Sequence, residues 1–221
     1  MTNSKLKLHK KIILEYQLKV LTGLHIGAGS EAVEIGGIDL PIIRRKDNHA
    51  PYIPGSSLKG KLRSLLQLDR GEFSFEGKSE DSPILRLFGN GHKEFGHSSR
   101  LIVRDAYLTK ESDELLFNSP SNDMPYSEVK AENVISRTRG SSDNLRFIER
   151  IPAGAEFSVQ FVINILDIPN GEKSPEEIEN DYLKTLEKGI NLLNNDYLGG
   201  HGSRGYGQVL LTIQKEEKIT L

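Results

Sequence analysis

Asp39 is the residue whose type and setting best suit chemistry on RNA or on a metal ion. It lies in the segment EIGGIDLP, one residue beyond two glycines, and not on a solvated helix. A carboxylate in such a loop can hold a hydrated divalent cation, or orient the 2′-hydroxyl of RNA for in-line cleavage. An Asp beside glycines also commonly forms a turn. Glu31, Glu34 and Asp47 are near it along the sequence, so residue type and spacing leave both roles open.

A basic segment, IPGSSLKGKLRSLL at residues 53–66, is a candidate for holding a phosphate backbone. Its candidate ligands are two serines and three basic residues: Ser56, Ser57, Lys59, Lys61 and Arg63. Either serine can cap a helix whose first amide groups and positive dipole then face an anion. Lys59 and Arg63 are one helical turn apart, so both can face the same backbone. The alternative is a solvated cationic helix face.

Two glycine-rich segments add further polar side chains. GGHGSRGYG, residues 199–207, would let backbone amides approach an anion, with Arg204 as a bidentate phosphate donor; a flexible turn is the alternative. Its glycines have the spacing of a dinucleotide fingerprint, but the segment precedes a strand, so we reject that interpretation. His25 lies between Gly23 and Gly27, where a ring that is presented rather than packed could contact RNA or transfer a proton. A structural role is the alternative.

Apolar periodicity predicts the elements that position these residues. Period-two alternation predicts four strands, at 14–20, 101–108, 155–165 and 209–213. One helix is predicted over 58–66, and a second over 174–193, where Ser174, Pro175 and Glu177 form an N-cap, an N1 proline and an N3 glutamate. The order strand, helix, strand, strand, helix, strand is that of the ferredoxin-like fold, which RRM modules share. The fold class is therefore α+β.

Composition limits the function further. The 221 residues include 29 Lys and Arg and 31 Asp and Glu, so the formal net charge is −2 and any RNA-binding surface must be local. Without cysteine, disulfides, thiolate zinc sites and a cysteine nucleophile are ruled out. Glu15, Gln17 and Lys19 interrupt the N-terminal apolar run. We therefore expect no signal peptide, no membrane span and no membrane partner, and a cytoplasmic protein.

Several segments, taken together, resemble the RAMP superfamily, and most closely the Cas-seven-like backbone subunit of type III-A CRISPR (Csm) effector complexes. They are GLHIGAGSEAVEIGGIDLPII, PYIPGSSLKGKLRSLL, LFGN, RLIVRDAYL, EVKAENVISRTRG, RFIERIPAGAEF and DYLGGHGSRGYGQV. They occur in the family's order from about Gly23 to Val209. The resemblance implies one RAMP domain over 1–221, a modified RRM-like palm with insertions at about 23–55 and 69–100, and a thumb hairpin within about 109–154.

The resemblance also implies the activity and the partners. Copies of the subunit stack along the CRISPR RNA (crRNA) with other Csm subunits, and each thumb distorts the guide–target duplex so that target RNA is cut at regular intervals. The family's cleavage aspartate corresponds to Asp39, which implies a divalent ion, Mg²⁺ or Mn²⁺, at that residue. His25 is implicated in RNA contact, residues 56–63 in a guide-backbone cradle that Arg204 supports, and the thumb residues Lys130, Arg137 and Arg139 in RNA binding.

Two competing functions are left open. A non-cleaving scaffold that only binds crRNA would not need Asp39. An unrelated ferredoxin-like interaction domain would have a merely solvated basic segment, and would bind no RNA in a salt-dependent way.

Overall fold

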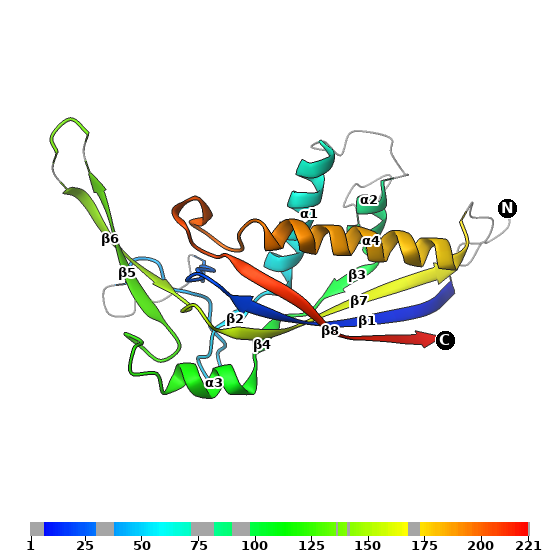
Figure 1. The fold of residues 1–221 in the computed structure, drawn as a ribbon, viewed down its shortest axis with the longest axis horizontal. Coiled ribbons are helices and arrows are strands. Elements are labelled where there is room, and N and C mark those ends of the chain that lie inside the picture. Colours follow the sequence, from blue (N-terminus) through cyan, green and yellow to red (C-terminus); the bar gives the residue numbers. More distant parts are fainter. Residues whose placement is uncertain are drawn as a thin grey trace.

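The structure is a computed structural model that describes residues 7–29, 38–71, 82–89, 98–135, 137–140, 142–167 and 173–220. An antiparallel sheet forms its centre, in the order β2-β4-β7-β1-β8, with β3 also paired to β7 (Figure 1). The strands are β1 (Lys7–Val20), β2 (Tyr52–Ile53), β3 (Leu101–Val103), β4 (Ala106–Leu108), β7 (Glu156–Asp167) and β8 (Val209–Thr220).

The connectivity confirms the expected ferredoxin-like arrangement. β7 lies between β1 and the β3/β4 pair, and β8 completes the sheet on the far side of β1. β1, the helix that follows it and the β3/β4 pair therefore form a split βαβ unit, with β7 lying between its strands. The predicted strand 101–108 is interrupted at Arg104 and Asp105, where the Asp105 carboxylate accepts a hydrogen bond from the Gly55 amide at 2.8 Å.

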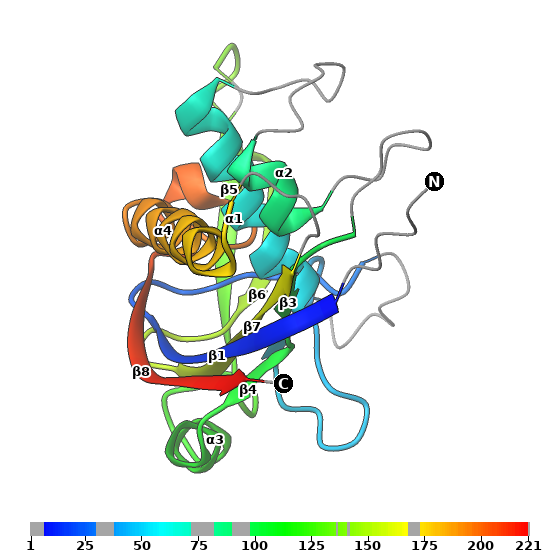
Figure 2. The ribbon, with the colours of Figure 1, turned by 90° about the vertical axis from the view of Figure 1, so that its right-hand side faces the viewer.

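Three helices cover one face of the sheet, as Figure 2 shows: α1 (Gly55–Arg70), α2 (Pro83–Phe88) and α4 (Pro175–Asn194). Their apolar faces pack on the inward side chains of β1 and β7, which alternate with outward residues that are mostly polar, the paired Ile13 and Val162 being apolar. Core residues from these elements include Ile12, Leu18, Leu58, Leu62, Phe157, Phe161, Leu186 and Leu193. Burying each such side chain contributes about 1.5–3 kcal/mol to folding. No helix in the described ranges is long and apolar enough to cross a membrane.

The starts of the two long helices differ in how well they follow from the sequence. At α4 the predicted capping box is confirmed: the Ser174 hydroxyl accepts from the Glu177 amide, and the Glu177 carboxylate accepts from the Ser174 amide. At α1 the predicted serine cap is wrong. The helix begins at Gly55 after Pro54, without a side-chain cap from Ser56 or Ser57. A Cβ at Gly55 would lie 2.2 Å from the Val103 carbonyl oxygen, so the packing of α1 on β3 requires glycine there.

The excursion after β4 contains a helix and a separate hairpin. α3 (Lys110–Phe117) lies on the sheet face opposite the other helices, and Thr109 caps it through the Ser112 amide. β5 (Glu128–Ile135) and β6 (Ser142–Arg150) form a two-stranded antiparallel sheet that projects away from the main sheet (Figure 1). This is the thumb hairpin that the family resemblance implies. The hairpin root, as used below, is the end of β5 and β6 at residues 127–132 and 147–150.

Candidate nucleic-acid interface

Asp39 lies against the hairpin root, about a hundred residues away in sequence. The amides of Asp39 and Leu40 donate to the Phe147 carbonyl at 3.1 and 3.3 Å, and the Glu149 amide donates to the Leu40 carbonyl at 3.0 Å. The Phe147 amide in turn donates to Asp39 Oδ2 at 2.7 Å. The segment around Asp39 thus runs beside β6 as an added partial strand, and it displays an exposed carboxylate there.

The chemistry of this carboxylate fits a shared ion better than a protein-only metal cage. One oxygen accepts from Phe147, and within the described part of the chain no hydrogen bond reaches the other, Oδ1. The described residues contain no group of three or more His, Asp or Glu side chains that could hold a metal ion. A single carboxylate suits a divalent ion that keeps most of its waters and is also bound by substrate phosphates. Asp47 instead pairs with Arg45, and Glu31 and Glu34 lie outside the described residues.

His25 is packed and not presented to solvent, contrary to our expectation for its environment. The residue is 6% exposed, and its Nδ1 lies 2.7 Å from the Glu149 carbonyl oxygen. A carbonyl can only accept, so Nδ1 carries the hydrogen and Nε2 is the acceptor in the neutral ring. Burial lowers the pKa of His25, which favours this neutral form. Contact with RNA through Nε2 stays a prediction.

The glycine-rich segment 199–207 is fixed against His25. The Gly200 amide donates to the His25 carbonyl at 2.9 Å, and the Gly207 amide donates to the Gly23 carbonyl at 3.0 Å. Within the segment, η1 (Gly202–Arg204) places Arg204 so that its Nη1 pairs with Glu132 of β5 at 2.8 Å. The Arg204 side chain is still 56% exposed. It therefore joins the segment to the hairpin root while leaving surface for a phosphate.

The basic residues of α1 have partners inside the protein. Lys59 Nζ donates to the Ser99 hydroxyl at 2.6 Å and to the Leu101 carbonyl at 2.7 Å. Burial, with a smaller effect from the positive charge of Arg63, lowers the pKa of Lys59. Burial also lowers the pKa of Arg63 itself. These side chains are therefore not a simple solvated cationic face.

Lys61, also on α1, contacts residues just before the glycine-rich segment 199–207. Its Nζ pairs with Asp196 at 3.0 Å and lies 3.7 Å from the centre of the Tyr197 ring. That ring packs so closely on Gly202 that a Cβ there would lie 2.0 Å from it. At the start of α1, Ser56 is exposed and Ser57 half-buried. The Asp105 carboxylate already accepts the hydrogen bond of the Gly55 amide at this helix terminus. A phosphate bound there would therefore lie close to a negative charge.

The candidate residues of the hairpin are spread along it. Lys130 lies at the hairpin root, 3.7 Å from Glu132 and 4.6 Å from the centre of the Tyr206 ring. Arg137 and Arg139 are exposed in the turn at the far end. The structure thus gathers Asp39, His25, Lys130 and Arg204 around the hairpin root, and holds the α1 residues and the two tip arginines apart from them.

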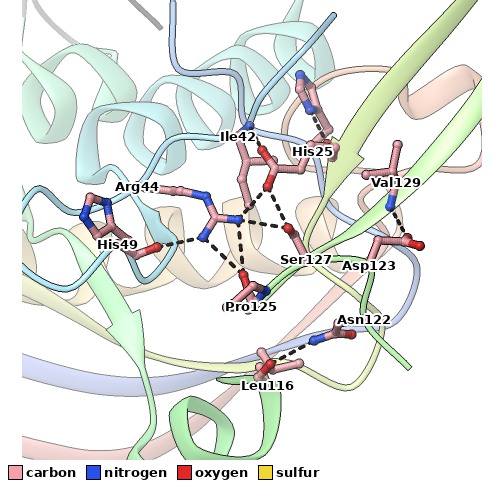
Figure 3. Close-up of polar contacts among 11 residues, drawn as sticks. His25, Ile42, Arg44, His49, Leu116, Asn122, Asp123, Pro125, Ser127 and Val129 are labelled. Atoms are coloured by element: carbon pink, nitrogen blue, oxygen red, sulfur yellow. Dashed lines mark hydrogen bonds and ion pairs between the residues drawn. The ribbon is translucent and has the colours of Figure 1, made fainter. Parts of the chain in front are cut away.

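One buried cluster at the hairpin root was missed by the sequence analysis (Figure 3). Glu149 is fully buried, and its carboxylate binds Arg44 Nη2 at 2.5 Å, the Ser127 hydroxyl at 2.6 Å and the Ile42 amide at 2.8 Å. Glu149 follows the buried Ile148 on β6, and period-two alternation puts the charged residue beside a buried apolar one on the exposed face. The alternation therefore gives no sign that Glu149 is buried, and only its tertiary contacts show it.

Comparison with known proteins identifies the family. Residues 17–209 match the RAMP superfamily. The chain belongs to the RAMP superfamily. Among relatives named "CRISPR system Cms endoribonuclease Csm3", that of Enterococcus italicus is 40% identical over 214 residues, covering 96% of this chain and 94% of the relative. That of Streptococcus thermophilus is 42% identical over 202 residues, covering 90% and 86%.

Solved structures agree with this RAMP assignment. A chain of the Csm3–Csm4 subcomplex in the type III-A CRISPR–Cas interference complex superposes with a TM-score of 0.54 at 26% identity, covering 96% of this chain and 80% of that one. Methanopyrus kandleri Csm3 superposes with a TM-score of 0.63 at 22% identity, covering 93% and 76%. The second likeness bears on the fold alone, and it confirms the modified ferredoxin-like architecture.

This RAMP chain differs from RRM modules on the open face of its sheet. RRM modules stack RNA bases on aromatic residues of that face. Here the outward residues at its centre are Glu15 and Gln17 of β1 and Ser158 and Gln160 of β7, which line a depression of about 550 Å³. The centre of the open face therefore lacks stacking aromatics, and the exposed Tyr107 of β4 lies beside Ser158 toward its edge.

Proposed function

We propose that this chain is a crRNA-binding backbone subunit of a type III-A CRISPR effector, and that it cleaves complementary target RNA at regular intervals. Residues 1–221 act as one RAMP domain in the cytoplasm, with crRNA, target RNA, further copies of the chain and other Csm subunits as partners. The observation that carries the proposal is the exposed Asp39 carboxylate, bonded to the Phe147 amide at 2.7 Å beside the projecting hairpin. The relatives named as endoribonucleases at about 40% identity support it.

The hairpin supplies the distortion that cleavage of a duplex needs. Leu145 and Phe147 are two residues apart on β6, so they share one face, and they are 53% and 39% exposed. Apolar side chains on such a face can displace a base from the guide–target stack. A regular A-form duplex holds the 2′-oxygen out of line with the leaving 5′-oxygen, and local unstacking removes that restraint. Asp39 lies directly beside Phe147, next to the linkage that is freed.

The proposed reaction is attack of the target's 2′-hydroxyl on the adjacent phosphorus. It leaves a 2′,3′-cyclic phosphate and a 5′-hydroxyl. Asp39 is the residue that would hold a divalent ion, Mg²⁺ or Mn²⁺, which supplies neutralisation of the phosphate charge when bound. The rigid bond from the Phe147 amide fixes one oxygen of this carboxylate. That bond leaves the other oxygen for the ion or for the 2′-hydroxyl.

Guide RNA is held by residues on both sides of the hairpin root. The proposed RNA-binding residues are His25, Ser56, Ser57, Lys59, Lys61, Arg63, Lys130, Arg137, Arg139 and Arg204. The neutral His25 ring accepts a hydrogen bond through Nε2. The half-exposed Arg204 reaches phosphate from the glycine-rich segment. The net charge of −2 is compatible with this, since the cationic groups need only be locally concentrated.

The test uses the reconstituted effector with an end-labelled RNA complementary to the guide. Asp39→Ala is expected to abolish the evenly spaced, divalent-ion-dependent products, a loss of ~100-fold or more in rate, while target affinity changes by less than about threefold. Asp47→Ala is the matched control, because it removes a nearby exposed carboxylate that pairs with Arg45. A target with one 2′-deoxy substitution at the cut site should resist cleavage there.

The opposite result favours the scaffold function. If Asp39→Ala binds target and leaves the product pattern unchanged, the chain does not cleave through this carboxylate. Cleavage of the 2′-deoxy linkage at the normal rate contradicts the proposed nucleophile.

A further inference from the structure

We propose that Glu149 is the positioning residue of the cleavage site, holding Asp39 and His25 in their working arrangement. The inference rests on the proposed function and deepens it. It starts from the buried cluster of Glu149, Arg44, Ser127 and Ile42, shown in Figure 3 and called the Glu149 cluster below.

Glu149 contacts both the segment that follows Asp39 and the ring of His25. Its amide donates to the Leu40 carbonyl at 3.0 Å, and its carboxylate accepts from the Ile42 amide at 2.8 Å. Both partners follow Asp39 within three residues, so their positions fix the backbone that displays the Asp39 carboxylate. The Glu149 carbonyl accepts from His25 Nδ1 at 2.7 Å. The Glu149 carboxylate therefore fixes the Asp39 segment, and the backbone carbonyl of the same residue fixes the tautomer of His25.

The Glu149 carboxylate is itself held from several directions. Oε1 accepts from Arg44 Nη2 at 2.5 Å and from the Ser127 hydroxyl at 2.6 Å. Arg44 also donates to the Ser127 hydroxyl at 2.9 Å and to the carbonyls of His49 and Pro125. The Arg44 and Glu149 side chains are 15% and 0% exposed. The cluster thus joins residues 38–51, the start of β5 and the end of β6 into one hydrogen-bonded unit.

A buried ion pair of this kind fixes the positions of the groups bonded to it, and it adds little to the stability of the fold. Desolvating two charges costs about as much as their attraction returns, so an apolar replacement of both is often equally stable. What an apolar replacement cannot do is accept a hydrogen bond from a chosen amide. Glu149 uses one oxygen for Ile42 and the other for Arg44 and Ser127, which leaves a single orientation of the Asp39 segment.

Other ion pairs of the hairpin do not reach this segment. Arg150, the next residue on β6, points to the other face and pairs with Glu128 at 2.6 Å. That pair has the same chemistry and a place at the same hairpin root, but side chains that are 22% and 32% exposed. Glu128→Gln is therefore a matched control for Glu149→Gln.

The cleavage experiment uses single-turnover reactions of the reconstituted effector. Glu149→Gln keeps the shape of the side chain and leaves Asp39 and His25 chemically intact. We expect its cleavage rate constant to fall by ~10-fold or more, with an unchanged reaction amplitude and a target affinity within about threefold of wild type. A purely structural role lowers the amplitude instead, since fewer complexes are active. In an Asp39→Asn background, Glu149→Gln should cause no further loss, because the two residues act as a unit.

A second measurement does not depend on cleavage. Hydrogen exchange of residues 38–44 is expected to accelerate in Glu149→Gln and to stay at the wild-type rate in Glu128→Gln. If Glu149→Gln does not assemble, Ser127→Ala removes only one hydrogen bond to the carboxylate and should show the same changes at a smaller size, two- to threefold in rate. If wild type does not cleave at all, the proposed function fails, and exchange alone decides the positioning role.

The proposal is overturned by either of two results. One is wild-type exchange of residues 38–44 together with a wild-type rate in Glu149→Gln. The other is an equal loss of rate in Glu128→Gln, which would mean that any hairpin-root carboxylate serves.

Discussion

Gly199→Ala is the substitution whose effect can be worked out most directly from the structure. Gly199 has φ of +78°, a conformation that costs an alanine about 1–2 kcal/mol. Its new Cβ would lie 2.2 Å from the His25 carbonyl oxygen and 3.3 Å from Ile26. The glycine-rich segment and the segment around His25 must therefore separate by about 1 Å to reach ordinary contact.

That separation breaks a specific hydrogen bond. The same His25 carbonyl accepts from the Gly200 amide at 2.9 Å, and a buried hydrogen bond of this kind contributes about 1 kcal/mol. Adding this to the backbone cost gives a loss of about 2–3 kcal/mol in the free energy of unfolding. Gly205→Ala is the control, because Gly205 has φ of +85° but nothing within 4 Å of its Cβ position. Its cost is the backbone term alone.

The assay is urea denaturation of both variants and wild type, followed by circular dichroism. Gly199→Ala should unfold at lower urea than Gly205→Ala, by at least about 1 kcal/mol in free energy at equal slope. Equal destabilisation of the two variants, within about 0.5 kcal/mol, would show that the approach to His25 is not tight and would refute the packing argument.

Two further substitutions test the site and the fold. Burial lowers the pKa of His25 below its ordinary 6.5, so the unfolded state binds the proton more readily, and stability present above about pH 6.5 is lost as pH falls toward the folded pKa. Wild type should therefore lose more thermal stability than His25→Gln between pH 7.5 and 5; parallel curves would contradict this. Ser174→Ala removes the hydroxyl that accepts from the Glu177 amide at 3.3 Å, and should cost about 1 kcal/mol in urea denaturation. An unchanged midpoint would mean that this capping box does not stabilise α4.

The fold was predictable where local pattern and tertiary structure agree. The alternation of β7 and the capping box of α4 depend on neighbouring residues, so these elements lie close to where the sequence predicts them. The strand predicted at 14–20 ends at Val20 as expected, but β1 begins earlier, at Lys7. The start of α1 was not predictable in this way. Its first amide is satisfied by Asp105, 50 residues away, and no local rule chooses that carboxylate over the adjacent serines. The helix α3, which has a short polar sequence, was missed as well.

The candidate site was predictable in residue identity but not in physical state. The glycine-rich settings of Asp39, His25 and Arg204 mark them in the sequence, yet the burial of His25 and the pairing of Arg204 with Glu132 depend on long-range contacts. From the sequence, Lys59 could equally be a solvated cation, whereas in the structure it donates hydrogen bonds to Ser99 and Leu101. Glu149 carries no signal, because its meaning comes wholly from Arg44, Ser127 and Ile42.

The bond between Asp39 and β6 has a consequence for where RNA is cut. A carboxylate bonded to β6 has a fixed place relative to the exposed side chains of the projecting hairpin. Under the proposed function, the hairpin that opens the duplex is thus also the arm that sets the distance to the scissile linkage. Each copy measures its cut from its own hairpin, and the spacing of products reports the spacing of hairpins along the guide.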